Sequence, residues 1–387
     1  MLIKATTRNL HRGYTYTALA YFGITSLWVI FLQQRGLSLV QIGLCESIFH
    51  LTSFLSEVPS GILADRFSYR TMLISGRIAA AIHAIIMLTA HSFWWFALGF
   101  VVQAWAYNLQ SGTLEALFYE SLVDGQQTKR YPQVTSNMNT IIELADTSGV
   151  LVAGWLIHGY LAATYWGYLL LAVLTIVVIL GLHEPTAHAK HAQQLTLWQI
   201  LKAAVTWLHR LPKLAYLMGF HALFSAIGTT YYYYFQAVMT THGFHGSLIS
   251  GILIAVALLN VGAVQLTPRL QQRWSSRNLL VGLTGLLIGA LILTGIGQIT
   301  LLVGGYLFIN MLMAVIEPLM SNYYNALIPS AQRATLLSIS SMAFSIVMIV
   351  MFPLIGWLIE QLGFAATFSW LGLLLLLVGG VAVKSNH

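Results

Sequence analysis

The sequence predicts an all-α membrane protein in which twelve transmembrane helices form two pseudo-symmetric six-helix bundles. Composition is the first reason, because 58% of the 387 residues are hydrophobic and only 7% are charged, unlike a soluble domain of this length. Length is the second, because apolar runs of about 20 residues, enough to cross a bilayer, recur along the chain. The third is that Lys and Arg lie in the short gaps between these runs.

The apolar runs give the order of the spans and the domain boundaries. The predicted spans are 14–34, 39–60, 71–91, 93–122, 133–158, 161–182, 212–236, 247–268, 277–297, 299–328, 333–360 and 364–384. One gap is long, so we expect an N-terminal bundle at 1–183, a cytoplasmic linker at 184–211 and a C-terminal bundle at 212–387. Apolar residues at helical spacing within the linker predict an amphipathic helix on the inner membrane face.

The positions of Lys and Arg predict the orientation. With the N-terminus inside, seventeen of the eighteen Lys and Arg residues fall in inner segments, and only Arg35 falls outside. Cytoplasmic loops of membrane proteins carry this excess. We therefore expect a multi-pass protein of the plasma (inner) membrane with both termini cytoplasmic. The bilayer then accounts for the net charge of +7, and we expect no nucleic-acid partner. Residues 1–12 lack a small-residue cleavage site, so we expect no cleavable signal peptide.

The two halves of the chain resemble each other. Five short matches recur in the same order at a nearly constant separation, which indicates a duplicated six-helix unit. Units with an even number of spans enter the membrane from the same side, so we expect parallel halves with a cavity between them. The matched pairs are Gly36 with Gly243, Phe67–Arg70 with Trp274–Arg277, Glu115 with Glu317, Gly154–Ile157 with Gly356–Ile359, and Ala162–Thr164 with Ala365–Thr367.

Polar and ionisable residues inside the spans are the strongest functional signal, because a charged side chain at a helix centre costs roughly 2.5–3.5 kcal/mol. They recur at helical spacing on four predicted helices, so each stripe faces protein or water rather than lipid. The stripes are Glu46, His50, Ser53 and Glu57; Tyr107, Ser111, Glu115 and Tyr119; Ser136, Asn139, Glu143 and Asp146; and Asn310, Glu317, Ser321 and Asn325.

These acids have few opposite charges to pair with. We expect no Lys or Arg deep in any span, with Arg77 about one turn into its helix, and the buried candidates for pairing are His50, His83 and His221. Burial without an opposite charge favours the protonated form of a carboxyl group. The acids that we predict to couple a proton or the substrate are Glu115, Glu143, Asp146, Glu317 and Glu46. The alternative for each is a neutral acid whose hydrogen bonds hold helices together.

Residues 231–235 are four consecutive tyrosines and a phenylalanine, followed by Gln236. Consecutive side chains point all round a helix, so at most two of the tyrosines can line a cavity. Two interpretations are open, an aromatic wall for an amphipathic or cationic ligand and a belt at the outer membrane interface. The cavity-lining candidates are Tyr107, Tyr119, Asn139, Tyr231, Tyr234, Gln236, Asn310 and His50. A second pattern, Gly282, Gly285 and Gly289, predicts close packing between helices.

The sequence lacks the common enzyme and metal-binding motifs. It contains no H-E-x-x-H, G-x-S-x-G or Walker pattern. The linker histidines lack a companion cluster of Cys or carboxylates. The single cysteine, Cys45, lies in an apolar run and is expected to be a buried inert thiol. We therefore expect no enzyme, no catalytic residues, no metal site and no cofactor, with the proton gradient as the energy source.

The stretch Gly61–Arg70, GILADRFSYR, joins the second and third predicted spans. Together with the twelve spans and the duplicated halves, it resembles the signature loop of the major facilitator superfamily (MFS) of secondary transporters. Ser68 replaces the family's usual second glycine, and Tyr69 stands where a basic residue is common. In the family this loop latches the outward-facing state. The resemblance implies a conformational latch formed by Gly61, Asp65, Arg66, Arg70 and Glu120.

The resemblance also bears on function. The segment 111–120 is similar to that of compact bacterial MFS proteins that are often labelled efflux pumps. Tyr107 stands where drug exporters carry an arginine, and Gly149 and Gly154 match the antiporter pattern only in part. We expect a monomeric, proton-coupled exporter (a multidrug-type antiporter) of small amphipathic molecules, cationic or neutral, that works by alternating access. The alternatives are a proton-coupled symporter that imports a nutrient or small metabolite, and a non-transporting membrane receptor or enzyme.

Overall fold

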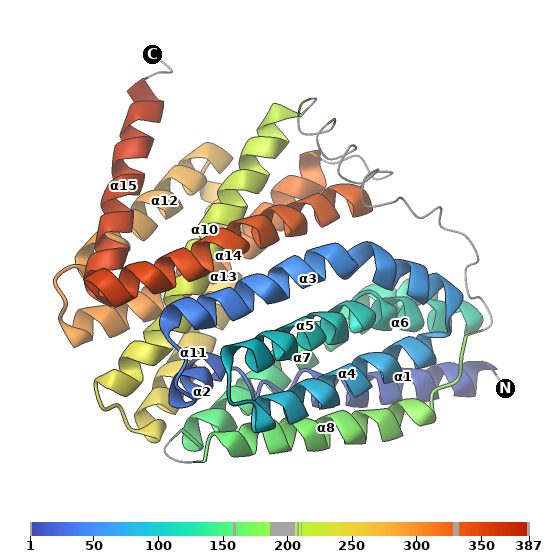
Figure 1. The fold of residues 1–387 in the computed structure, drawn as a ribbon. Coiled ribbons are helices and arrows are strands. Elements are labelled where there is room, and N and C mark those ends of the chain that lie inside the picture. The colour runs from blue at the N-terminus through green and yellow to red at the C-terminus, as the bar shows by residue number, and fades with distance from the viewer. Residues whose placement is uncertain are drawn as a thin grey trace. The chain divides into compact units, whose positions relative to one another are not determined.

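The computed structural model describes residues 2–157, 160–185, 211–327 and 333–384, and the single positions 206 and 209. Every regular element in these ranges is a helix (Figure 1), which confirms the predicted fold class. Contacts divide the chain into two compact units. Unit 1 consists of Met1–Phe31 and Ile48–Leu201, and unit 2 of Leu32–Ser47 and Lys202–His387. The predicted linker at 184–211 lies mostly outside the described residues, and its amphipathic helix stays a prediction.

The helices follow the predicted spans in order. The helices before the linker are α1 (Leu2–Ala20), α2 (Trp28–Gln34), α3 (Leu39–Arg66), α4 (Tyr69–Thr89), α5 (Phe93–Gln110), α6 (Thr113–Asp124), the short 3₁₀ helix η1 (Thr128–Arg130), α7 (Tyr131–Trp155) and α8 (Ala162–Leu180). Those after it are α10 (Pro212–Thr241), α11 (Gly246–Arg273), α12 (Ser276–Thr294), α13 (Ile299–Leu327), α14 (Arg333–Leu362) and α15 (Phe364–Lys384). Among the described residues, seven helices are long and apolar enough to cross a membrane by length and hydropathy alone.

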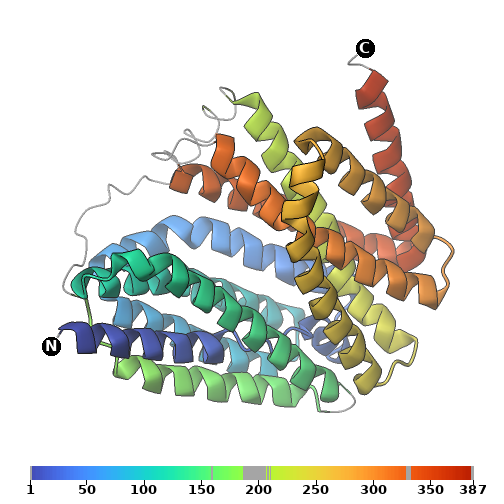
Figure 2. The same ribbon diagram turned by 180° about the vertical axis from the view of Figure 1, so that it is seen from behind.

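Each unit has its own buried core. In unit 1, α1 lies between α7 and α8 (Figure 2) and packs on both. Tyr16, Leu73 and Phe118 are almost completely buried where α1, α4 and α6 meet. In unit 2 the core is aromatic, because Tyr231 of α10 packs against Phe368 of α15 with ring centroids 4.7 Å apart.

The internal duplication has a local physical basis. Ser68 and Ser275 have the same extended backbone, and each side-chain oxygen accepts a hydrogen bond from the amide three residues later, so they cap α4 and α12 in the same way. Gly36 and Gly243 have φ values of +86° and +72°, a left-handed conformation that suits glycine. Two of the five matched pairs therefore lie at corresponding helix ends in the two halves.

Two predicted spans are interrupted. The span 14–34 consists of α1 and α2 with a break at 21–27, and α1 starts earlier than predicted. The span 93–122 breaks between α5 and α6, where Gly112 has φ +75°. Neither break was predicted, because each segment has the length and the mostly apolar composition of a single span.

Gly149 of α7 lets the first break pack closely. A Cβ at Gly149 would lie 2.3 Å from the backbone nitrogen of Gly23, and a Cβ at Gly23 would lie 2.3 Å from Oδ1 of Asp146. By contrast, a Cβ at Gly282, Gly285 or Gly289 would have no described atom within 4 Å. The predicted close packing at those three glycines is therefore wrong.

We expect Gly149→Ala to destabilise the protein. The added methyl group would clash with the backbone of Gly23, which has no flexible side chain to move aside, and overpacking of this kind typically costs about 1–3 kcal/mol. The measurement is the thermal unfolding midpoint, Tm, of purified protein in detergent. The matched control is Gly251→Ala, where a Cβ has no described neighbour within 4 Å. Equal Tm values for the two variants would contradict the close contact.

Candidate functional site

The side chains that most resemble a proton-carrying site lie in unit 2, on α10, α13 and α14. Glu317 of α13 comes directly before Pro318, which interrupts the helix's hydrogen bonds. Oε1 of Glu317 lies 3.1 Å from Nε2 of His221 and accepts a weaker bond from Ser225 at 3.4 Å. His221 and Ser225 are four residues apart on α10, so one face of that helix presents both to the carboxylate.

The hydrogen-bonded chain continues beyond His221. Nδ1 of His221 lies 3.2 Å from the hydroxyl of Tyr324, which in turn accepts a hydrogen bond from Ser340 at 3.3 Å. Tyr324 lies two helical turns after Glu317 and therefore on the same face of α13. We call Glu317, His221, Tyr324 and Ser340 the coupling cluster.

Exposure differs sharply along the coupling cluster. The side chain of Glu317 is 62% exposed and that of His221 is 15% exposed. The carboxylate is thus held at Oε1, while more than half of the Glu317 side chain is exposed. When His221 is protonated the contact is an ion pair, and when it is neutral the contact is a hydrogen bond. Sequence reasoning found Glu317 and named His221, and it missed Tyr324 although its spacing from Glu317 was a usable signal.

The predicted polar residues of unit 1 differ from one another in how far their side chains are exposed. Asn139, Glu143 and Asp146 are all exposed, as a polar stripe along one face of α7 requires. Glu115, in the first turn of α6, is partly buried, and its Oε2 is buried without a hydrogen-bond partner among the described residues. Tyr107 is exposed. The roles of these residues stay predictions.

The remaining candidates occupy varied positions. Tyr119 is exposed, Glu46 and Asn310 are partly buried, and His50, Tyr231, Tyr234 and Gln236 are buried. Tyr231 is completely buried among aromatic rings, so in this structure it is a core residue rather than a cavity wall.

The predicted latch is described only in part. Glu120 is buried, Arg66 is exposed, and Gly61 and Arg70 are partly buried. The side chain of Asp65 lies outside the described residues, so the latch stays a prediction.

Glu184, which the sequence did not single out, makes hydrogen bonds at the end of this loop. Glu184 accepts hydrogen bonds from the backbone amides of Tyr69 at 2.6 Å and Arg70 at 3.3 Å, and so caps the start of α4.

The expectation that no Lys or Arg lies deep in a span is wrong for Arg77. This arginine is 5% exposed and lies eight residues after the start of α4, about 12 Å along the helix axis. Its guanidinium donates to Oε1 of Gln110 and lies 5.6 Å from the centre of the Tyr16 ring. Spacing alone could not reveal this burial, because the Tyr16 and Gln110 side chains beside Arg77 come from α1 and α5.

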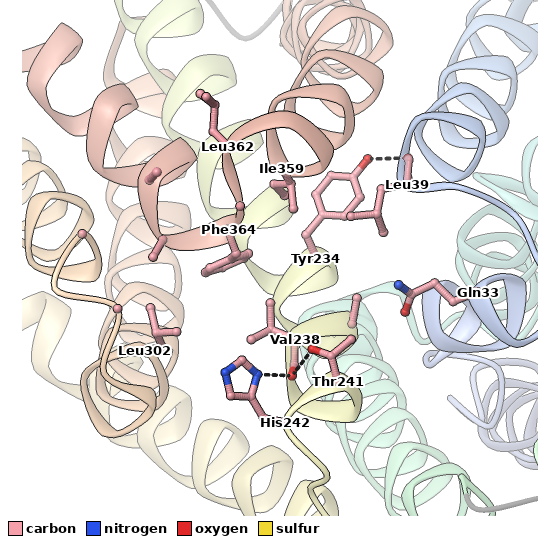
Figure 3. Close-up of a pocket in the computed structure, with 16 residues that line it drawn as sticks. Gln33, Leu39, Tyr234, Val238, Thr241, His242, Leu302, Ile359, Leu362 and Phe364 are labelled. Atoms are coloured by element: carbon pink, nitrogen blue, oxygen red, sulfur yellow. Dashed lines mark hydrogen bonds between the residues drawn. The ribbon is translucent and has the colours of Figure 1, made fainter.

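Unit 2 also contains a cavity of about 470 Å³ at the end of its helices (Figure 3). Its wall includes Gln33, Leu39, Tyr234, His242 and Phe364. The side chains of Thr241 and His242 bond to the Val238 carbonyl of their own helix, and none of the described lining residues is an acid. This cavity suits an apolar or aromatic group, and it does not contain the coupling cluster.

The start of α3 is packed in unit 2 beside this cavity. We call residues 39–47 the docked segment. The hydroxyl of Tyr234 lies 2.8 Å from the carbonyl oxygen of Phe352 in α14 and 3.2 Å from that of Leu39, the contact drawn in Figure 3. One phenol therefore bridges the docked segment and α14.

The docked segment packs against α14 at Pro353, where the helix lacks one backbone hydrogen bond. Pro353 has no amide hydrogen, so the carbonyl of Ile349 lacks its usual partner within the helix. Ser47 donates a hydrogen bond to that carbonyl at 2.7 Å. A Cβ at Gly43 would lie 2.6 Å from Cα of Pro353, so the backbones touch at this point.

Comparison with known proteins identifies the family. The family model described as Major Facilitator Superfamily matches residues 13–323. The inner membrane protein YqcE of Escherichia coli (strain K12) is 29% identical over 86 residues, 20% of each chain. The uncharacterized MFS-type transporter YxaM of Bacillus subtilis (strain 168) is 22% identical over 381 residues, 94% of this chain and 92% of that protein.

Solved structures agree in fold. The nucleoside transporter NupG superposes with a TM-score of 0.76 at 15% identity, covering 98% of this chain and 99% of that one. A POT family transporter in complex with 5-aminolevulinic acid gives a TM-score of 0.69 at 12% identity, covering 98% and 96%. With its twelve helical spans, its two units and a family match over most of its length, the chain belongs to the Major Facilitator Superfamily of transporters.

Proposed function

We propose that this transporter is proton-coupled and that Glu317, assisted by His221, carries the proton. The observation that supports the proposal best is the state of the Glu317 carboxylate. It lies within a long apolar helix, one oxygen is held by His221, and the side chain is 62% exposed. An acid that only held helices together would be enclosed by its partners.

Protonation of Glu317 changes what holds α10, α13 and α14 together. A charged carboxylate attracts a protonated His221, and a neutral carboxyl group does not. Tyr324 and Ser340 connect the same histidine to α14. Gain or loss of the proton therefore alters the contacts of three helices at once, next to Pro318, which removes a backbone hydrogen bond from α13. This is the property that alternating access with proton coupling requires.

The proposed substrate is a small amphipathic molecule, cationic or neutral, and the proposed direction is export. The intramembrane acids and the aromatic residues of α10 support a cationic or aromatic solute. The second candidate is import of a nutrient or metabolite with a proton. It is favoured by the similar solved structures, which are those of a nucleoside transporter and a POT family transporter.

The test uses purified wild-type protein in liposomes that contain a pH-sensitive dye. Candidate compounds are first selected by their effect on Tm at two pH values, and each selected compound is then added outside the liposomes. We expect at least one compound to move protons when it is added. Alkalinisation of the lumen indicates exchange, and acidification indicates symport. Transport of a stabilising compound with no proton movement under any imposed gradient would overturn the proposal.

A further inference from the structure

The buried arginine of unit 1 is not explained by the coupling cluster. Arg77 is 5% exposed, and two of the side chains beside it, Tyr16 and Gln110, are 0% and 6% exposed. The hydroxyl of Tyr16 also donates to Oε1 of Gln110, at 2.9 Å. Gly76 allows this arrangement, because a Cβ there would lie 3.2 Å from the carbonyl oxygen of Ala106, so α4 and α5 approach closely.

The charge of Arg77 is not balanced by these contacts. Both partners are neutral, and within the described part of the chain no carboxylate lies within ion-pair distance of the guanidinium. The Nε atom is buried and has no hydrogen-bond partner there. A buried charge is costly unless an opposite charge accompanies it, and intramembrane arginines generally mark a ligand path or an ion pair.

A carboxylate is the group that fits an arginine with vacant donors. The planar guanidinium offers two parallel N–H groups to the two oxygens of a carboxylate, which neither an amide nor a ring can match. We propose that Arg77 is a carboxylate-binding residue, and that Gln110 and Tyr16 hold its guanidinium in place while no carboxylate is bound.

Two sources of the carboxylate share this chemistry. The first is Glu115, which lies just beyond the break between α5 and α6 and has a buried oxygen without a described partner. Gln110 is the last residue of α5, and Gly112 between them has φ +75° with open space around it. A change in the backbone conformation of Gly112 would move Gln110 away from Arg77 and bring Glu115 beside it. The second source is the carboxylate of a transported solute that is neutral overall, as a zwitterion is, and only this source rests on the proposed transport function.

The experiment measures Tm and ligand binding, neither of which requires proton coupling. The variants are Arg77→Gln, Arg77→Lys, Glu115→Gln and the double variant Arg77→Gln with Glu115→Gln. The matched control is Arg130→Gln, because Arg130 is an exposed arginine outside the spans. Acetate and benzoate are the carboxylate probes, and benzamide is the neutral probe of similar shape.

Each source predicts a different result. If Glu115 is the partner, the loss of Tm in Arg77→Gln is reversed in the double variant by about 3 °C or more, and the probes have no effect. If Arg77→Gln gives no folded protein, the recovered yield of the double variant is the readout. If a solute is the partner, benzoate but not benzamide raises the Tm of the wild type and of Glu115→Gln. That shift is then lost in Arg77→Gln and weakened in Arg77→Lys.

Other outcomes overturn the inference. An Arg77→Gln variant with the Tm of Arg130→Gln, together with a wild type that ignores both carboxylate probes, would show that no carboxylate is bound. A lower Tm that is neither reversed by Glu115→Gln nor accompanied by a response to the probes would reduce Arg77 to a structural residue. Because these readouts do not involve transport, they leave the role of Glu317 untouched.

Discussion

Replacing Glu317 by glutamine is expected to abolish proton-coupled transport and to leave the protein folded. The amide of glutamine has nearly the shape of the carboxyl group, and its oxygen can still accept from His221 and Ser225. It cannot bind or release a proton at physiological pH. A positioned proton-transfer group typically contributes about 10²–10⁴ in rate, so we expect at least a hundredfold loss of solute-driven proton movement in liposomes.

Exchange of labelled for unlabelled solute separates coupling from binding. If Glu317 carries the proton and does not hold the solute, Glu317→Gln retains this exchange because no net proton movement is needed. Tyr324→Phe, which breaks the chain beyond His221, is expected to reduce coupling by less than tenfold. The control is Glu184→Gln, since that acid lies outside the spans and caps α4.

Full coupled transport by Glu317→Gln, at the wild-type pH dependence, would contradict this assignment. The proton would then have to be carried elsewhere, and Glu115, Glu143 and Asp146 of unit 1 would be the next residues to test. Loss of folded protein in the variant would show instead that the contact with His221 is mainly structural. The Tm of purified Glu317→Gln distinguishes these outcomes before any transport assay.

Much of the fold could be predicted because a bilayer imposes simple rules. Length and apolarity locate a span, and caps such as Ser68 and Ser275 mark where helices begin. The residue that we propose as the proton carrier could be picked out from the sequence, because Glu317 lies in a polar stripe within an apolar run. Its partners were harder to find, since the contact between α10 and α13 joins residues almost a hundred positions apart.

Two of the missed features depend on contacts between helices. The break after α1 exists because Gly23 meets Gly149, and nothing in either local sequence reports that meeting. Arg77 looked like an interfacial arginine because its distance from the loop is short. It is buried because Tyr16 and Gln110 come from neighbouring helices. The spacing of Gly282, Gly285 and Gly289 predicted close packing between helices, but a Cβ at any of the three would have no described atom within 4 Å.

Alanine at Gly356 or Gly43 is expected to release the docked segment from α14. A Cβ at Gly356 would lie 2.6 Å from the carbonyl oxygen of Leu39, and one at Gly43 would lie 2.7 Å from the nitrogen of Pro353. Both clashes are with backbone atoms, so a rotamer change cannot relieve them. The hydrogen bond from Ser47 to Ile349 would be lost together with the backbone contact.

Cys45 provides the measurement, because it is the only cysteine of the chain, lies within the docked segment and is completely buried. A thiol reacts with a maleimide only when it is exposed, so its labelling rate reports how often the segment leaves α14.

We expect at least a tenfold faster rate for Gly356→Ala and Gly43→Ala, and a smaller increase for Tyr234→Phe, which removes the bridging hydroxyl. Gly304→Ala is the control, since a Cβ there has no described atom within 4 Å. A labelling rate equal to that of the control in both variants would mean that the segment does not depend on this backbone contact. The bridge formed by Tyr234 and the bond from Ser47 would then have to hold it.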